Sequence, residues 1–153
     1  MAEYRLLIQG KWLESKTIKK ILSPYDQSLV AEVHFAEKEQ VEEAIQAADE
    51  AFSKTKKLCS FERALTLEKI SQETKRRQEE LARSITLQSG KTIKDSRTEV
   101  ERAASTFLIA SEEAKRMEGQ VIPLDLSLQA ARRWGLVRRF PIGVISAITP
   151  FNF

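Results

Sequence analysis

Short apolar runs alternate with polar residues over the first 35 positions, and this pattern predicts β-strands. Residues 4–12 are expected to form a hairpin that turns at Gln9-Gly10. Two further strands are expected over residues 18–22 and 29–35, with a turn at residues 24–28, where proline and small polar side chains gather. The amino-terminal part is therefore predicted to consist of short strands.

In the middle of the chain the apolar residues recur at helical spacing, which predicts three amphipathic helices. Their expected ranges are 37–54, 61–89 and 93–118. Ser60 is expected to cap the second helix, and Gly90 is expected to stop it. The stripe of the second helix that is expected to be buried consists of Leu67, Ile70, Thr74, Leu81 and Ile85.

The pattern becomes extended again near the carboxyl end. Residues 134–140 alternate between two faces, both of which carry arginine, and this favours a strand at an interface. Residues 143–149 are apolar or small without alternation, which is typical of a strand covered on both faces in a parallel sheet. Such a strand needs parallel neighbours that the sequence does not offer. We therefore expect the chain to be a piece of a larger α/β protein.

Asn152 follows this last strand, and ligands bind beyond the carboxyl ends of strands in open α/β sheets. Its side-chain amide offers two N–H donors in one plane. Such donors stabilise negative charge that develops on a carbonyl oxygen in a transition state. Asparagine is also a common turn residue, and the neighbouring residues by themselves favour that simpler role.

Composition and charge are those of an ordinary globular protein. The 153 residues suffice for one compact core, and 42% of them are apolar and 31% charged. The sequence contains neither an apolar run long enough to cross a membrane nor a secretory signal pattern, so no membrane partner and a cytoplasmic location are expected. A net charge of +3 does not indicate nucleic-acid binding.

The single cysteine, Cys59, and the single histidine, His34, exclude an internal disulfide and a Cys/His metal cluster, so no metal is expected. Neither has an evident catalytic partner in the sequence, and we interpret both as structural. Basic clusters occur at residues 75–77, 132–133 and 138–139, on different predicted elements. We interpret them as solvated faces or oligomer contacts.

The carboxyl-terminal segment resembles a motif of the aldehyde dehydrogenase superfamily, P-x-G-V-x-x-x-I-x-P-W-N-[FY]-P. In this chain it reads Pro141-x-Gly143-Val144-x-x-x-Ile148-x-Pro150-Phe151-Asn152-Phe153. The aromatic residue before the asparagine is Phe151, where many members of the superfamily carry tryptophan and some branches carry phenylalanine.

Three weaker motifs follow the order of the same superfamily. They are Ile8-Gln9-Gly10-Lys11-Trp12, Ser23-Pro24-Tyr25-Asp26 with Val30-Ala31-Glu32-Val33 behind it, and Leu87-Gln88-Ser89-Gly90-Lys91. Together with the carboxyl-terminal motif, they extend the resemblance over essentially the whole chain. Two positions depart from the pattern: Gln27 stands where a turn glycine is frequent, and Gln88 stands where an acidic residue is frequent.

This resemblance implies an α/β fold, namely an incomplete amino-terminal part of the aldehyde dehydrogenase fold. Its parts would be short strands, three helices, oligomerisation strands and the first buried parallel strand of a variant Rossmann domain. Residues 1–122 would belong to the cofactor-binding domain and residues 123–140 would begin the oligomerisation domain. Residues 141–153 would return to the cofactor-binding domain, where the chain is truncated. A homodimer or homotetramer would follow.

The resemblance also implies NAD(P)-dependent oxidation of an aldehyde to a carboxylic acid through a cysteine thiohemiacetal and thioester. Asn152 matches the asparagine of the oxyanion hole. Ile148, Thr149, Pro150 and Phe151 match a segment beside the nicotinamide of NAD or NADP. The nucleophile, the general base and a cofactor-binding lysine lie downstream in the superfamily, so this chain alone is expected to be inactive.

Two other functions stay open from the sequence. One is a truncated, non-catalytic subunit or interaction module that pairs with full-length subunits. The other, which is weaker, is a basic helical protein that binds nucleic acid. The sequence does not distinguish NAD from NADP, does not identify the aldehyde, and does not decide between water and coenzyme A as the acyl acceptor.

Overall fold

A computed structural model of the protein describes residues 2–149. At its amino end, β2 (Leu6–Ile8) and β3 (Lys11–Leu13) form the predicted antiparallel hairpin. Both turn residues have positive φ, 52° at Gln9 and 75° at Gly10, which is the requirement of a type I′ turn. The twist of this turn matches that of the two strands, so the turn residues favour the hairpin locally.

The other early strands form a separate three-stranded sheet in the order β1-β5-β4. β1 (Ala2–Tyr4) runs parallel to β5 (Leu29–Phe35), and β4 (Thr17–Leu22) runs antiparallel to it. The predicted strands at residues 18–22 and 29–35 are therefore confirmed. Gln27, in the turn that joins them, has φ 59°, a left-handed conformation that glycine adopts more easily.

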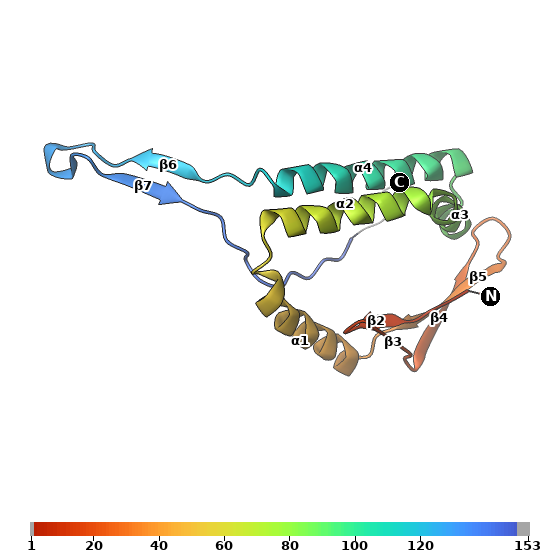
Figure 1. Ribbon diagram of the computed structural model, residues 1–153. Helices are drawn as coiled ribbons and strands as arrows, with labels where there is room; N and C mark the ends of the chain where they lie inside the picture. The colour runs from red at the N-terminus through yellow and green to blue at the C-terminus, as the bar shows by residue number, and fades with distance from the viewer. Residues whose placement is uncertain (1, 150–153) are drawn as a thin grey trace.

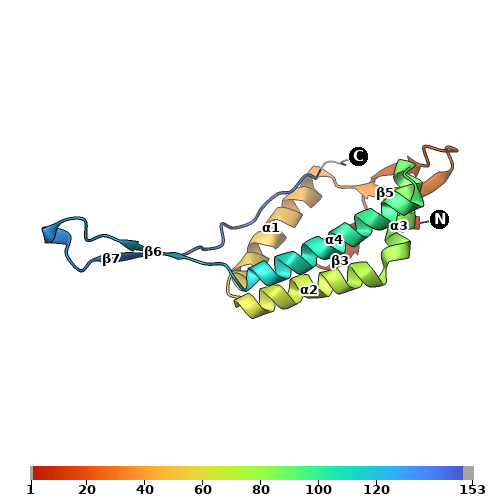
Figure 2. The same ribbon diagram turned by 90° about the horizontal axis from the view of Figure 1, so that it is seen from above.

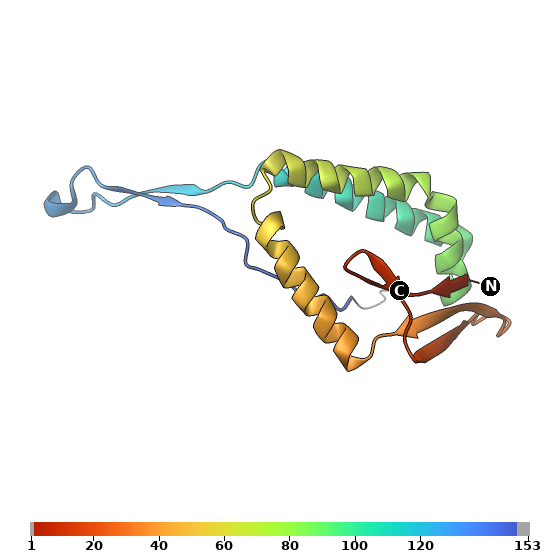
Figure 3. The same cartoon turned by 60° about the horizontal axis from the view of Figure 1, so that its bottom comes forward.

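Helix α1 (Lys38–Thr55) confirms the first predicted helix. Its start is fixed by a capping box, in which the backbone N–H of Glu37 donates to Gln40 Oε1 at 3.0 Å. Figure 3 shows α1 running from the strands to the start of the next helix. It therefore joins the strand part of the molecule to the helical part.

The second predicted helix is wrong as a single helix, because the structure divides it into α2 (Ser60–Arg76) and α3 (Gln78–Ser89). The helical backbone is interrupted at Arg77, which has φ −98° and ψ 20°. Ser60 is the first helical residue of α2, and the capping position belongs to Cys59. Gly90 does stop α3, with a left-handed φ of 75°.

Helices α2 and α4 (Ile93–Ala114) lie side by side, as Figures 1 and 2 show from two directions. The residues buried in these two helices are mostly small: Ala64, Ser71, Ser96, Val100, Ala104 and Ser111. The hydroxyl of Ser71 donates to the carbonyl oxygen of Ala104 at 2.7 Å, and that of Ser111 donates to Ala64 at 2.9 Å. Small side chains let the two backbones come close enough for these hydrogen bonds.

The buried stripe predicted for the second helix is therefore only partly right. None of its five members is fully buried, and Ile70 remains 39% exposed. The fully buried positions of α2 and α3 are Ala64, Ser71 and Ala82. The predicted stripe consists mainly of large apolar residues, whereas the positions that are fully buried in α2 and α3 carry small residues.

Helix α3 turns away from α2 and is held against α4 by polar contacts. The guanidinium of Arg97 donates to both carboxylate oxygens of Glu79, at 2.7 and 2.9 Å. The hydroxyls of Thr86 and Ser96 lie 2.9 Å apart, and Ser96 is fully buried. Because these contacts join α3 to α4, they favour the bend at Arg77 over one straight helix.

Helix α4 ends at Ala114, before the predicted end at residue 118. After it, β6 (Gln120–Pro123) and β7 (Trp134–Val137) pair into an antiparallel ribbon, with a 3₁₀ turn (Leu128–Ala130) near its tip. The ribbon projects from the rest of the molecule in Figures 1 and 2. At its base, a Cβ atom added to Gly119 would lie 2.1 Å from the carbonyl oxygen of Val137.

The buried strand predicted at residues 143–149 is not formed. The structure has no regular secondary structure from residue 138 to residue 149, and Ile145 and Ile148 are 73% and 95% exposed. A parallel strand needs neighbours to accept and donate its backbone hydrogen bonds. No strand among residues 2–149 pairs with this segment, so it remains extended without being part of a sheet.

Candidate functional site

The segment that leads to the candidate site begins at the base of the ribbon. Gly143 has φ 123°, a conformation that side-chain-bearing residues rarely adopt, and nothing lies within 4 Å of the position that a Cβ atom would take. A glycine is therefore required at position 143 by the backbone conformation, and not by the closeness of neighbouring atoms. Beyond Gly143 the chain runs back beside α1 toward the hairpin, as Figure 3 shows.

An apolar cavity of about 340 Å³ lies between part of this segment and the amino-terminal elements. The segment contributes Val144, Ile145 and Ser146, the hairpin contributes Leu6, Leu7 and Ile8, and the remaining lining comes from residue 36 and α1. The segment thus approaches the site alongside the hairpin and α1. Sequence reasoning missed this contact, because nothing in the pattern links residues so far apart.

The predicted site residues lie at and beyond the end of this segment. Ile148 and Thr149 are exposed. The other predicted site residues, Pro150, Phe151 and Asn152, lie outside the described residues. Their roles therefore remain predictions, and the structure fixes only the path of the chain up to residue 149.

Two of the sequence motifs that resembled the superfamily meet in space. A Cβ atom at Gly90 would lie 3.1 Å from the ring carbon Cγ of Pro24, so the end of α3 packs against the turn between β4 and β5. The next residue, Lys91, forms an ion pair with Glu99 of α4. These motifs therefore hold the strand and helix parts together, and they lie in the scaffold.

His34 is buried in a polar network that joins three parts of the chain. Its Nδ1 accepts the backbone N–H of Ser15 at 2.8 Å, and its Nε2 lies 3.0 Å from the carboxylate of Glu3. The hydrogen bond from His34, together with Arg5, lowers the pKa of the Glu3 carboxyl below its ordinary value. The structural interpretation of His34 is supported by these contacts.

Cys59 occupies the N-terminus of α2, which the sequence did not indicate. It is exposed, and its backbone N–H donates to the carboxylate of Glu62 at 2.8 Å. That hydrogen bond lowers the pKa of Glu62. The contact shown around Cys59 is thus a helix-capping contact, which agrees with a structural role.

The basic cluster at residues 75–77 is largely neutralised by acids on the same helices. Arg76 forms an ion pair with Glu73, and Arg77 forms one with Glu80. These contacts lower the pKa of both carboxyls. Within residues 2–149 there is no group of three or more side chains placed to hold a metal ion, and no helix there is long and apolar enough to cross a membrane.

Strands that pack beside bent, closely paired helices and a projecting two-stranded ribbon define a mixed α/β protein. A model of the aldehyde dehydrogenase family matches residues 12–153. The chain belongs to the aldehyde dehydrogenase family.

Individual relatives agree with this assignment. The chain is 37% identical over 150 residues to a 3-sulfolactaldehyde dehydrogenase of Priestia aryabhattai, covering 98% of this chain and 31% of that protein. It is 34% identical to a lactaldehyde dehydrogenase of Methanocaldococcus jannaschii, covering 97% of this chain and 30% of that protein. The chain therefore spans about 30% of the length of these relatives.

Solved structures show the same fold. Aldehyde dehydrogenase 21 of Physcomitrella patens, solved with its reaction product succinate, matches with a TM-score of 0.86 and 35% identity, covering 92% of this chain and 29% of that chain. A betaine aldehyde dehydrogenase of Staphylococcus aureus, solved with NAD+, matches with a TM-score of 0.75 and 30% identity, covering 80% of this chain and 25% of that chain. The predicted fold class is therefore confirmed, although residues 143–149 do not form their strand.

Proposed function

We propose that the complete protein that contains this chain is an NAD(P)-dependent aldehyde dehydrogenase. The observation that carries the proposal is the family match over residues 12–153, which includes the whole motif from Pro141 to Phe153. Relatives that act on 3-sulfolactaldehyde and lactaldehyde support a small polar aldehyde as the substrate. The product is the corresponding carboxylic acid.

Asn152 is proposed to stabilise the transition state of the carbonyl addition step. When a thiolate adds to the aldehyde, the carbonyl oxygen gains a negative charge, and a positioned amide N–H donor lowers the energy of that oxyanion. Asn152 carries such an amide and follows the segment that runs beside α1. The nucleophile, the general base and the cofactor-binding lysine are proposed to lie in the remainder of the complete protein.

Ile148, Thr149, Pro150 and Phe151 are proposed to line the nicotinamide side of NAD or NADP. Ile148 is 95% exposed and belongs to no strand, so its apolar side chain is available to contact a flat ring. When bound, the nicotinamide would accept a hydride from the substrate carbon. The contribution of this chain is to position that ring and to exclude water from one side of it.

The test is the substitution Asn152→Ala in the complete enzyme. Loss of one oxyanion donor is expected to lower kcat by roughly 100- to 1000-fold, because such donors contribute about 2.7–4 kcal/mol to transition-state stabilisation. The rate is measured as the appearance of reduced cofactor by absorbance against a panel of aldehydes. The chemical step must first be shown to limit turnover, for example by a single-turnover experiment.

The variant Asn152→Asp separates the catalytic role from the turn role. Aspartate has almost the same shape and adopts turn conformations as readily as asparagine does. It offers no amide donor, however, and its charge would repel an oxyanion. A rate for Asn152→Asp close to that of the wild type would reject the oxyanion role in favour of a turn role.

The ribbon is proposed to begin an oligomerisation domain over residues 123–140, between parts of the cofactor-binding domain at residues 1–122 and 141–153. An isolated two-stranded ribbon is marginally stable in water, and this one exposes Trp134 and Leu136 at 64% each. Pairing with another subunit would cover these side chains, giving a homodimer or homotetramer. A monomer in light scattering of the complete protein would exclude this arrangement. The cytoplasmic location stays a prediction.

The alternative function is a non-catalytic subunit. The intact mass of the natural polypeptide distinguishes the two proposals. A mass well above 17.4 kDa supports the enzyme, and a mass of 17.4 kDa supports the non-catalytic subunit.

A further inference from the structure

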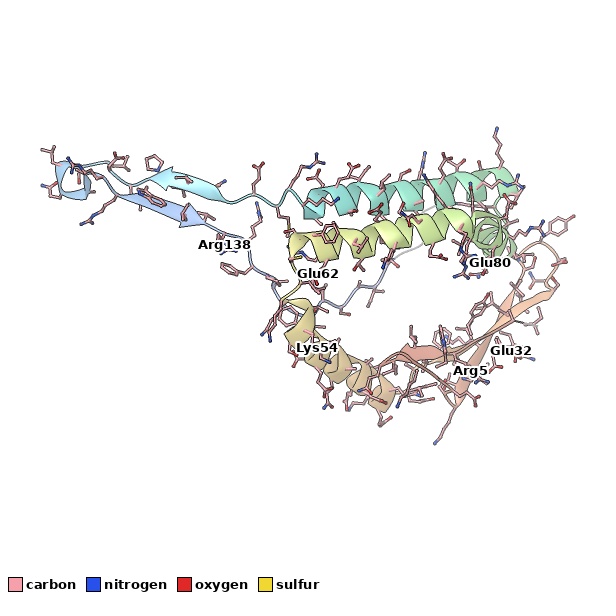
Figure 4. All side chains as sticks on the ribbon, in the orientation of Figure 1. Arg5, Glu32, Lys54, Glu62, Glu80 and Arg138 are labelled. Carbon is pink, nitrogen blue, oxygen red and sulfur yellow. The ribbon has the colours of Figure 1, made fainter. Side chains whose placement is uncertain are left out.

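A second cavity, of about 810 Å³, lies where the helical part of the molecule meets the base of the ribbon. Its walls come from the end of α1, the start of α2 and the loop between them, and from Met117, residues 138–141 and Gly143. Figure 4 labels Arg138 at the base of the ribbon and Glu62 in the first turn of α2, on either side of this junction. The cavity is therefore assembled from stretches that are distant in sequence.

The charged residues that line this cavity are all cationic. They are Lys56, Arg63, Arg138 and Arg139, and no aspartate or glutamate lines the cavity with them. Among residues 2–149 none of the four forms an ion pair with an acidic side chain. This differs from the cluster at residues 75–77, where the two arginines pair with glutamates. The cavity thus concentrates positive charge that the chain itself leaves uncompensated.

Arg63 is held in place by two hydrogen bonds, while its Nε has no acceptor among residues 2–149. Its two terminal nitrogens donate to the carbonyl oxygen of Leu58 at 2.5 Å and to Ser60 Oγ at 3.1 Å. Its Nε is buried and has no hydrogen-bond partner within the described part of the chain. A buried, charged donor without an acceptor is costly. The two hydrogen bonds made by the terminal nitrogens fix the guanidinium at the wall of the cavity.

Two of the other cations rest on aromatic rings of the same cavity. The ammonium of Lys56 lies 5.6 Å from the ring centre of Phe52, and the guanidinium of Arg138 lies 5.6 Å from that of Phe140. These contacts restrict the cationic side chains without neutralising them.

We propose that this cavity binds a phosphate-bearing anion. Several guanidinium groups suit the oxygens of a phosphate, because each presents N–H donors in a planar fork and the group carries more than one negative charge. The cations surround one hollow and do not form a stripe, which favours a small phosphate ester over a polynucleotide. The proposal does not rest on the reaction proposed for the complete enzyme.

The test is a calorimetric titration of the complete protein with inorganic phosphate, and then with pyrophosphate, at low ionic strength. Saturable binding with one site per subunit is expected. The double variant R138Q/R139Q is expected to weaken it by at least roughly tenfold, since two charge-assisted hydrogen-bonding groups are removed. Both arginines are exposed and form no side-chain hydrogen bond within residues 2–149, so the fold should survive, as circular dichroism can verify.

The matched control is R132Q/R133Q, which removes the same two charges from the same ribbon but away from the cavity. Unchanged phosphate affinity in this control supports the site. An equal loss in both double variants would show a general effect of net charge and would overturn the proposal. Absence of saturable phosphate binding by the wild type would overturn it as well.

Two further titrations identify the source of the phosphate. Repeating the experiment with saturating NAD abolishes phosphate binding if a cofactor phosphate occupies the cavity, and leaves it unchanged if a separate phosphate ester does. Tighter binding of a single-stranded oligonucleotide than of pyrophosphate, with loss in R132Q/R133Q as well, would reject the small anion in favour of nucleic acid. Aldehyde turnover is not the readout, so failure here is distinguishable from failure of the proposed enzyme function.

Discussion

Two regions of the molecule differ in burial and in hydrogen bonding: the helical pair α2 and α4, and the carboxyl-terminal stretch from residue 120 to residue 149. The helical pair buries Ala64, Ala104, Ser71 and Ser111 and satisfies both serine hydroxyls within the pair. In the carboxyl-terminal stretch no described residue is buried, and its two strands, β6 and β7, pair only with each other. The first region supplies its own partners, whereas the second presents groups that need partners.

This difference separates a region whose stability depends on contacts within this chain from a region whose stability depends on contacts with other parts or partners. Close packing and internal hydrogen bonds make the stability of α2 and α4 a property of this sequence. The ribbon and residues 143–149 bury no side chain and leave part of their backbone unpaired, so their stability depends on what covers them. Substitutions in the two regions should therefore have effects of different size and reach.

The largest effect is expected from Ala104→Leu. Ala104 is fully buried, and α2 and α4 are close enough there for its carbonyl oxygen to accept the Ser71 hydroxyl. A larger side chain would force the helices apart, and we expect the free energy of unfolding of the purified protein to fall by about 3 kcal/mol. Urea denaturation followed by circular dichroism measures it.

The control is Ala103→Leu, the same change at the adjacent position of α4, where the side chain is exposed. It should alter the free energy of unfolding by less than about 0.5 kcal/mol. Equal destabilisation by the two variants would mean that α2 and α4 are not closely packed, and the contrast between the two regions would disappear.

A smaller and local effect is expected from Gly119→Ala. The new methyl group would lie 2.1 Å from the carbonyl oxygen of Val137, so the base of the ribbon must open. Hydrogen exchange of the β6 and β7 amides should accelerate, while the midpoint of urea unfolding of α2 and α4 stays the same. Gln120→Ala, next to it in β6, introduces no atoms and serves as the control. Slower exchange of the β6 and β7 amides, or unfolding of α2 and α4 at a lower urea concentration, would contradict the independence of the two regions.

The smallest effect concerns pH. The hydrogen bonds from Arg97 hold the pKa of Glu79 below its ordinary value of 4.5. A carboxyl whose pKa is lower in the folded protein stabilises the fold above its unfolded pKa, and that contribution disappears as the pH falls through the folded value. Because both side chains are about half exposed, the effect should be small.

The measurement is the urea midpoint of wild type and Glu79→Gln at several pH values. The wild type should be slightly more stable at pH 7, and the difference should vanish well below pH 4.5. Glu101→Gln, an exposed position of α4 for which the described residues show no ion pair, should show no such dependence. A difference in urea midpoint between wild type and Glu79→Gln that persists at low pH would show that the ion pair of Glu79 with Arg97 does not stabilise α3 through its charge.

The sequence predicted the locally determined elements correctly. Gln9-Gly10 and Gly90 were found because a hairpin turn and a helix end each require particular local backbone conformations. The break at Arg77 was missed because it has no glycine or proline to mark it. It is favoured by contacts between α3 and α4, such as that between Arg97 and Glu79, which local sequence does not reveal.

For the candidate site, the motif predicted more than the structure can test. The residue types from Pro141 to Phe153 identified the family, and the match over residues 12–153 confirms that assignment. The strand at residues 143–149 could not form from this chain, because its hydrogen bonds belong to neighbours that residues 2–149 do not contain. Asn152 lies outside the described residues, so its role remains a prediction.

The contact between Gly90 and Pro24 has a consequence for how the sequence can evolve. A side chain at position 90 would meet the Pro24 ring at 3.1 Å, and its backbone would also be strained at φ 75°. A smaller side chain at position 24 would remove the steric contact and leave the backbone strain at position 90 unchanged. Mutational tolerance should therefore be asymmetric: a library varied at both positions would accept many residues at 24 beside glycine, and few residues other than glycine at 90 whatever occupies 24.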